Sequence, residues 1–151
     1  MARTRKQTQS SSGREALRKN GMMAHLLDSL DEGQDIGHFG RLVFAMVARY
    51  FLDEEELRDT LLQDPAFDER QALALIEQVK ARDYSPPRRE KVLQFQSQQE
   101  FPICPNAEDP DACNVYKDLQ FPESVYEHIS EYREQKAHAH AVEEAAEGQP
   151  G

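Results

Sequence analysis

The chain has 151 residues, with 28 acidic and 18 basic side chains and a formal net charge of −10 at pH 7. This length suits one domain with tails, and the strong acidity argues against a protein that coats nucleic acid by charge alone. No apolar run approaches the ~18 residues of a transmembrane helix, and the first residues lack the apolar core of a secretory signal. We therefore expect a cytoplasmic protein with no membrane contact.

Composition divides the chain into three predicted parts. Residues 1–13 form a basic tail rich in Ser and Thr, and residues 134–151 form an acidic tail rich in Ala. Both are expected to be disordered, because they contain too few apolar residues to fold. Residues 14–133 carry the apolar periodicity, which starts with a helical pattern at Arg14, and are predicted to form one helical domain.

Apolar spacings of three and four predict an all-α, compact bundle of about five to six helices. The stretch from Asp35 to Leu52 begins with a polar turn, and its densest apolar part, Leu42 to Leu52, contains no Gly or Pro. The stretch is too long for a buried strand, so it is predicted to form the central helix. A proline-rich loop over 101–114 carries both cysteines before the last helix. The other predicted helices cover 22–30, 53–62, 68–79, 88–99 and 121–133.

The first turn of the central helix carries two basic residues on one face. His38 and Arg41 are three residues apart, and a helix N-terminus already presents partial positive charge. A phosphate or carboxylate would relieve this conflict, so the pair predicts an anion site. The alternative is that an acid of the chain itself neutralises the pair, the candidates being Asp31, Glu32 and Asp35.

The motifs of common enzyme classes do not occur in the sequence. It has no phosphate-binding Gly-rich loop, no zinc-protease helix and no nucleophile elbow, so we expect no catalytic centre. Cys104 and Cys113 are separated by eight residues, which is wider than the usual zinc hairpin, and two thiolates cannot complete a tetrahedral site. Two alternatives therefore stay open for these cysteines. They are either buried thiols that bind no metal, or ligands of a metal.

The order of several short motifs resembles the C-terminal iron–sulfur domain of the archaeal and eukaryotic primase large subunit. The motifs are H-x-x-R at 38–41, D-P-A-F-D-E at 64–69, D-Y-S-P-P at 83–87, and a loop with two cysteines before a final aromatic-containing helix. The resemblance covers roughly Gly21 to Tyr126. It implies an accessory domain without a polymerising centre, which assists a catalytic partner in DNA replication or repair.

The resemblance also implies a binding role for three residues. His38 and Arg41 of the H-x-x-R motif, with Arg49 two turns later, would contact the template or the 5′-triphosphate of a primer. The implied partners are single-stranded DNA or a primer 5′ end, and a primase-polymerase or helicase protein.

The sequence departs from this family at the residues that bind the cofactor. The family holds a [4Fe–4S] cluster with four cysteines, and Cys104 and Cys113 match the third and fourth. The first and second positions fall on Met22 and Arg89, which cannot replace thiolates at such a cluster. The sequence therefore favours no cofactor. The alternative is a [4Fe–4S] cluster or zinc held by Cys104, Cys113 and further ligands that the sequence does not identify.

A second function stays open beside nucleic-acid binding. An acidic, helical protein–protein adaptor could keep the scaffold of this domain after losing the phosphate site, and the net charge favours that interpretation. The two hypotheses differ in whether His38, Arg41 and Arg49 are available to a ligand.

Overall fold

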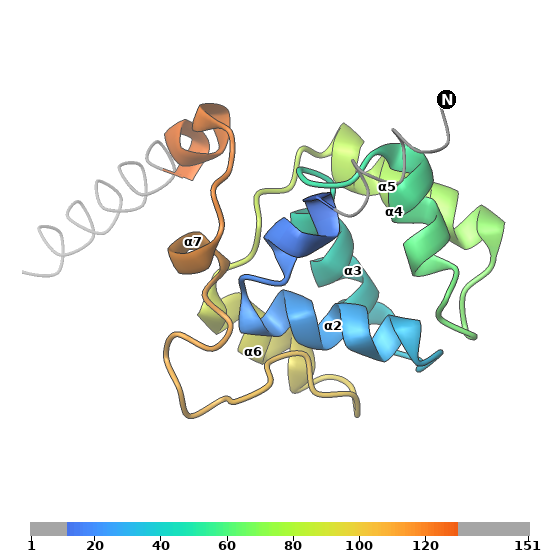
Figure 1. Ribbon diagram of the computed structural model, residues 1–151, viewed down its shortest axis with the longest axis horizontal. Helices are drawn as coiled ribbons and strands as arrows, with labels where there is room; N and C mark the ends of the chain where they lie inside the picture. The colour runs from blue at the N-terminus through green and yellow to red at the C-terminus, as the bar shows by residue number, and fades with distance from the viewer. Residues whose placement is uncertain (1–11, 130–151) are drawn as a thin grey trace, which may run out of the picture. The chain divides into compact units, whose positions relative to one another are not determined.

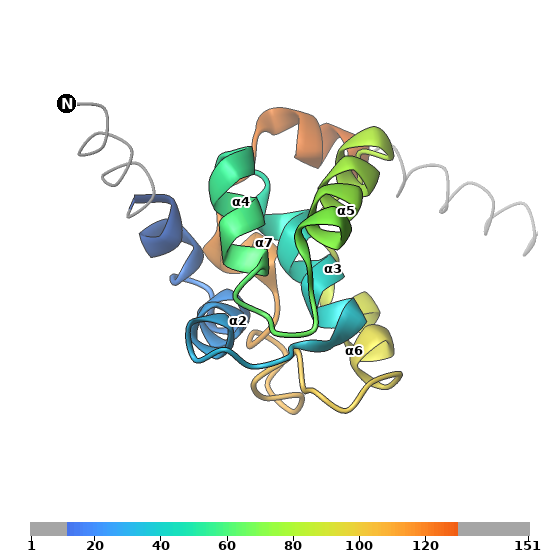
Figure 2. The same cartoon turned by 90° about the vertical axis from the view of Figure 1, so that its right-hand side faces the viewer.

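The computed structural model describes residues 12–129, and its regular structure in that range is helical without strands (Figures 1 and 2). This confirms the predicted all-α class. Residues 12–17 and 123–129 are also helical, which gives more helical segments than predicted. The labelled helices are α2 (Gly21–Asp31), α3 (Gly37–Ala48), α4 (Glu54–Leu61), α5 (Glu69–Ala81), α6 (Arg89–Gln96) and α7 (Val115–Asp118).

The chain forms two compact units, one ending at Gln120 and the other beginning at Phe121. The predicted domain over 14–133 spans the boundary between these units. The tails predicted over 1–13 and 134–151 lie outside the described residues, except that residues 12 and 13 already belong to a helix. Nowhere between residues 12 and 129 is a helix both long enough and apolar enough to cross a bilayer.

Helix α3 is the centre of the first unit, as its apolar density predicted. It packs against α2, α4, α5 and α6, and every residue from Val43 to Ala48 is buried (Figure 1). Burying a large apolar side chain stabilises a fold by about 1.5–3 kcal/mol, so this helix contributes much of the core. The helix ends at Ala48, four residues before the apolar run ends. The last residues of the run form the turn that leads to α4, and Leu52 is buried from that turn.

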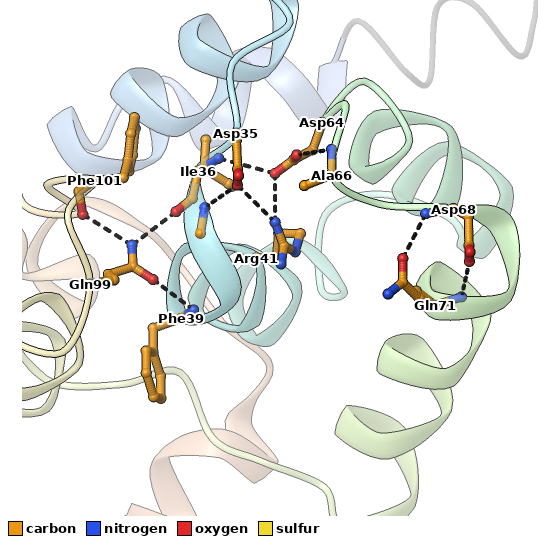
Figure 3. A network of polar contacts seen from close by, with 11 residues as sticks. Asp35, Ile36, Phe39, Arg41, Asp64, Ala66, Asp68, Gln71, Gln99 and Phe101 are labelled. Carbon is orange, nitrogen blue, oxygen red and sulfur yellow. Dashed lines mark hydrogen bonds and ion pairs between the residues drawn. The ribbon is translucent and has the colours of Figure 1, made fainter.

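Side-chain caps fix where the helices begin. Asp53 accepts a hydrogen bond from the backbone N–H of Glu56. Asp68 and Gln71 form a complete capping box at α5, which Figure 3 draws. Asn20 accepts from the third residue of α2 and is fully buried. Such caps contribute about 1 kcal/mol each, and they explain why α4 and α5 begin at acidic residues.

Candidate functional site

Arg41 lies in a network of polar contacts within the protein (Figure 3). Its Nη1 donates to Oδ2 of Asp64 at 2.9 Å and to Oδ1 of Asp35 at 3.1 Å. The guanidinium also covers the ring of Phe67, 4.6 Å from the ring centroid, and the side chain is only 12% exposed. The charge of Arg41 is therefore neutralised from inside the chain, as the alternative interpretation of the sequence proposed.

Asp64 is the principal partner of Arg41 and is fully buried. Besides Arg41, it accepts hydrogen bonds from the backbone N–H groups of Ile36 at 3.0 Å and Ala66 at 2.8 Å. Three donors on one carboxylate compensate for its loss of hydration. Asp64 thus ties the turn after α4 to the start of α3.

Two of the three acids named from the sequence lie in separate clusters. Asp35 binds Arg41, whereas Asp31 binds Arg14 at 3.3 Å and Arg18 at 3.3 Å. Asp64, the buried partner, was not among the predicted acids. It lies 23 residues from Arg41 in the sequence, too far for a helical spacing rule to connect them.

The N-terminus of α3 is also occupied by groups of the chain itself. The backbone N–H of Gly37 donates to Asp35 at 2.9 Å, and that of Phe39 donates to Oε1 of Gln99 at 2.9 Å. Gln99 in turn donates from Nε2 to the carbonyl oxygens of Ile36 at 2.9 Å and Phe101 at 3.0 Å (Figure 3). These N–H groups are the ones that a phosphate at a helix terminus would use.

Gly37 allows Gln99 to approach this closely. Its φ of +80° is unfavourable for a residue with a side chain, and a Cβ at this position would lie 2.4 Å from Oε1 of Gln99. The glycine of the polar turn thus makes room for a side chain that caps the central helix from another part of the chain.

We expect Gln99→Ala to lower the free energy of unfolding by about 2–3 kcal/mol, because it removes three hydrogen bonds from partly buried backbone groups. Urea unfolding followed by circular dichroism measures the loss. Gln98→Ala is the control, since Gln98 is exposed and its side chain makes one long bond of 3.4 Å. Equal stability of the two variants would contradict the capping role.

Arg49 lies directly after α3, about 12 Å along the helix axis from Arg41. Its Nη2 donates to Asp83 at 2.7 Å and to the carbonyl oxygen of Tyr84 at 3.0 Å, and its guanidinium lies over the ring of Tyr50. The side chain is 11% exposed. Arg49 therefore holds the turn after α5 against the end of α3, and it is not brought beside Arg41.

His38 is the exposed member of the three predicted binding residues. Its ring meets that of Phe39 edge to face, with 5.0 Å between centroids. Phe39 stacks on Phe95 of α6, with centroids 5.1 Å apart, and Nζ of Lys91 lies 5.3 Å from the centroid of Phe95. We call these four residues the aromatic platform. It combines ring faces with two groups that can carry positive charge.

Three of the four positions matched to the iron–sulfur family lie together. The thiols of Cys104 and Cys113 share a hydrogen bond, and both residues are buried. Arg89 of α6 acts electrostatically on Cys113, and its Nη2 donates to the carbonyl oxygen of Ala107 at 2.6 Å, within the cysteine loop. The arginine thus fastens this loop to α6.

The fourth position, Met22, lies at the start of α2 and is fully buried. The side chain of Asn20 donates to the carbonyl oxygen of Asn114 at 3.3 Å. Asn20 precedes Met22 by two residues, and Asn114 directly follows Cys113. The start of α2, which contains Met22, is therefore held against the end of the cysteine loop.

The residues present at these positions do not fit an iron–sulfur cluster or zinc. Burial, followed by the hydrogen bond with Cys104, raises the pKa of Cys113 to about 12, so that residue is a neutral thiol near pH 7. Arg89 supplies a cation and a donor rather than a ligand. Between residues 12 and 129, no group of three or more His, Cys, Asp or Glu side chains is arranged to hold a metal ion.

A scan against protein families, and searches of curated proteins and of solved structures, found no match to this chain.

Proposed function

We propose that this chain is an accessory helical domain that acts through protein contacts, on a scaffold that resembles the C-terminal domain of the primase large subunit but lacks its cluster. The observation that carries the proposal is the state of Arg41 and Arg49. Both cations are nearly buried and bonded to acids of the chain, Asp64 and Asp83 respectively. No catalytic step is assigned to the chain.

Magnitudes decide between this role and phosphate binding by Arg41. Leaving one member of a buried ion pair without its partner costs about 3–5 kcal/mol. A new hydrogen bond between a charged side chain and phosphate returns about 1.5–3 kcal/mol. The fully buried carboxylate of Asp64, 2.9 Å from Arg41, would also repel the phosphate. Binding a phosphate at Arg41 is therefore unfavourable unless the surrounding fold rearranges.

Two observations support the resemblance on which the scaffold part of the proposal rests. Arg89 acts on Cys113 beside Cys104, and the start of α2, where Met22 lies, is held against the end of the cysteine loop. The order of the motifs alone matched these positions to the four cysteines of the family, although the positions lie far apart in the sequence. Within that resemblance, the partner would be a protein that works with nucleic acid, such as a primase-polymerase or a helicase.

The aromatic platform favours a second candidate function, the binding of single-stranded nucleic acid. Proteins that bind single strands stack bases on aromatic rings and place cations beside the backbone. His38 and Lys91 are exposed at the platform and remain accessible to a strand, unlike Arg41 and Arg49. In this candidate function His38 keeps its predicted binding role, and Lys91 with the two phenylalanine rings takes the role predicted for Arg41 and Arg49.

A strand-binding assay separates the two candidates. We expect the full chain to bind a fluorescent 5′-triphosphorylated single-stranded DNA more weakly than about 100 µM at low salt, beyond the usual range of non-specific binding, because its net charge repels the backbone. Fluorescence anisotropy measures the affinity. Tighter binding that falls at least about five-fold in both His38→Ala and Lys91→Ala would overturn the adaptor proposal and support the platform.

The control for these variants is Lys80→Ala. Lys80 lies on α5, is exposed, and makes a surface ion pair with Glu54 that contributes little stability. Lys80→Ala therefore removes one positive charge at a position that is not part of the platform. Arg41→Ala is unsuitable as a test, because it leaves Asp64 buried without its cation and disturbs the fold.

A further inference from the structure

Cys104 and Cys113 lie at the two ends of a loop that folds back on itself. Backbone hydrogen bonds of 3.2–3.3 Å close three successive turns over residues 106–114. These turns return the chain to its starting point, so the two thiols share a hydrogen bond although eight residues separate them in the sequence. Both cysteines are buried.

Each end of this loop is bonded to a different helix of the first unit. The backbone N–H of Cys104 donates to Oε1 of Gln96, the last residue of α6, at 2.8 Å. At the other end, the carbonyl oxygen of Asn114 accepts from the side chain of Asn20, which caps α2, at 3.3 Å. The fold therefore holds the two thiols together, and their contact does not depend on the chance approach of a flexible segment.

The segment that joins the two cysteines lies at the surface. Residues 105–111 are exposed and contain neither helix nor strand. Surface loops of this kind open locally at a much lower cost in free energy than unfolding of the whole domain. Such an opening gives a small reagent access to the thiols, and oxidation to a disulfide is the reaction that two adjacent thiols undergo.

We propose that Cys104 and Cys113 form a reversible disulfide, with a small-molecule disulfide such as oxidised glutathione as the oxidant. Cys104 loses its proton, and its thiolate attacks one sulfur of the oxidant, which releases one thiol and leaves a mixed disulfide on Cys104. Cys113 then loses its proton and attacks the sulfur of Cys104, which releases the second thiol. The two cysteines give up two electrons and two protons, and the oxidant is reduced to two thiols.

The order of attack follows from the environments of the two thiols. Cys104 keeps 3% exposure, whereas Cys113 is fully buried. Burial, followed by the hydrogen bond with Cys104, raises the pKa of Cys113 to about 12. Because the thiolate is the nucleophile, Cys113 reacts poorly with an external reagent and serves as the second, resolving cysteine.

The disulfide makes the loop a redox-sensitive element of the fold. It joins the end of the loop that is bonded to α6 to the end that is bonded to α2. In a reducing compartment such a pair is oxidised only transiently, which is the usual behaviour of redox-sensing cysteines. This inference goes beyond the proposed adaptor function and does not rest on it.

The experiment equilibrates the full chain in buffers of reduced and oxidised glutathione, once folded and once in urea. Intact-mass spectrometry measures the fraction of chains that have lost two hydrogens. In urea the thiols meet only through a flexible loop, which gives an effective concentration in the millimolar range. We expect the equilibrium constant for disulfide formation to be at least about ten-fold larger in the folded chain, because the fold already holds the thiols together.

The single variants C113S and C104S are matched controls that each keep one thiol. We expect C113S to gain one glutathione at Cys104, and we expect C104S to react at least about ten-fold more slowly at Cys113. Faster reaction of C104S would overturn the order of attack. An equilibrium constant no larger in the folded chain than in urea, a disulfide between two chains, or a lasting glutathione adduct on the unsubstituted chain would overturn the proposal. The comparison in urea uses the unsubstituted chain, so the test does not depend on how the variants fold.

Discussion

Asp64→Ala is expected to lower the free energy of unfolding by about 3–5 kcal/mol. The substitution leaves the guanidinium of Arg41, only 12% exposed, without its closest acid, and it leaves the N–H groups of Ile36 and Ala66 without an acceptor. A domain of this size has a total stability of about 5–15 kcal/mol, so the variant is expected to be close to unfolding. Urea unfolding with circular dichroism measures the loss.

Two further variants show whether the loss comes from the buried charge. Asp59→Ala removes an exposed acid of α4 and is expected to change stability by less than about 0.5 kcal/mol. The double variant D64L/R41M removes both charges, so it is expected to recover part of the loss. Recovery stays incomplete because Ile36 and Ala66 still lack an acceptor. A loss in Asp64→Ala no larger than that in Asp59→Ala would contradict the buried ion pair.

The features that the sequence predicted well are local. The central helix follows from the density of apolar residues between Leu42 and Leu52, and burial of those residues does not depend on which neighbour covers them. The helices predicted over 53–62 and 68–79 begin at Asp53 and Asp68, which bond to backbone groups three residues away. Both kinds of feature are set by a few consecutive residues, which is why pattern rules find them.

The pairing of side chains across the fold could not be predicted in the same way. Arg41 bonds to Asp64, which is 23 residues away in the sequence, and the N–H of Phe39 bonds to Gln99, which is 60 residues away. Asp64 stands before a proline, where the sequence indicates only a turn and the end of a helix. Its burial depends on how α3 and α4 pack, so the sequence pattern could not identify it as the partner of Arg41.

His38 and Arg41 illustrate how one spacing leads to two environments. Three residues apart on a helix, they were predicted to share a face and a ligand. In the structure His38 is exposed beside Phe39, whereas Arg41 reaches the turn after α4. The H-x-x-R motif therefore gives the residue types but does not reveal that the arginine is already bonded. The role assigned to these residues stays a prediction.

The double variant M22C/R89C is expected to assemble a [4Fe–4S] cluster, with about four iron atoms per chain and a brown colour after anaerobic reconstitution with iron and sulfide. The reason is the position of the matched residues. Arg89 contacts the cysteine loop and acts on Cys113, and Met22 lies where α2 is held against the end of that loop. Replacing both supplies the missing thiols and removes the cation. Iron binding would then deprotonate Cys113 despite its raised pKa, because a coordinating metal stabilises the thiolate.

The matched control is M22S/R89S, which changes the same positions to small polar residues without adding a thiol. It is expected to stay colourless and to bind no stoichiometric iron. A folded M22C/R89C variant that stays equally colourless would show that these positions do not correspond to cluster ligands, and the resemblance would lose its main support. A cluster in M22C/R89C would support a common scaffold but not phosphate binding. The scaffold depends on the contacts of the cysteine loop, whereas phosphate binding depends on Arg41, which Asp64 already holds.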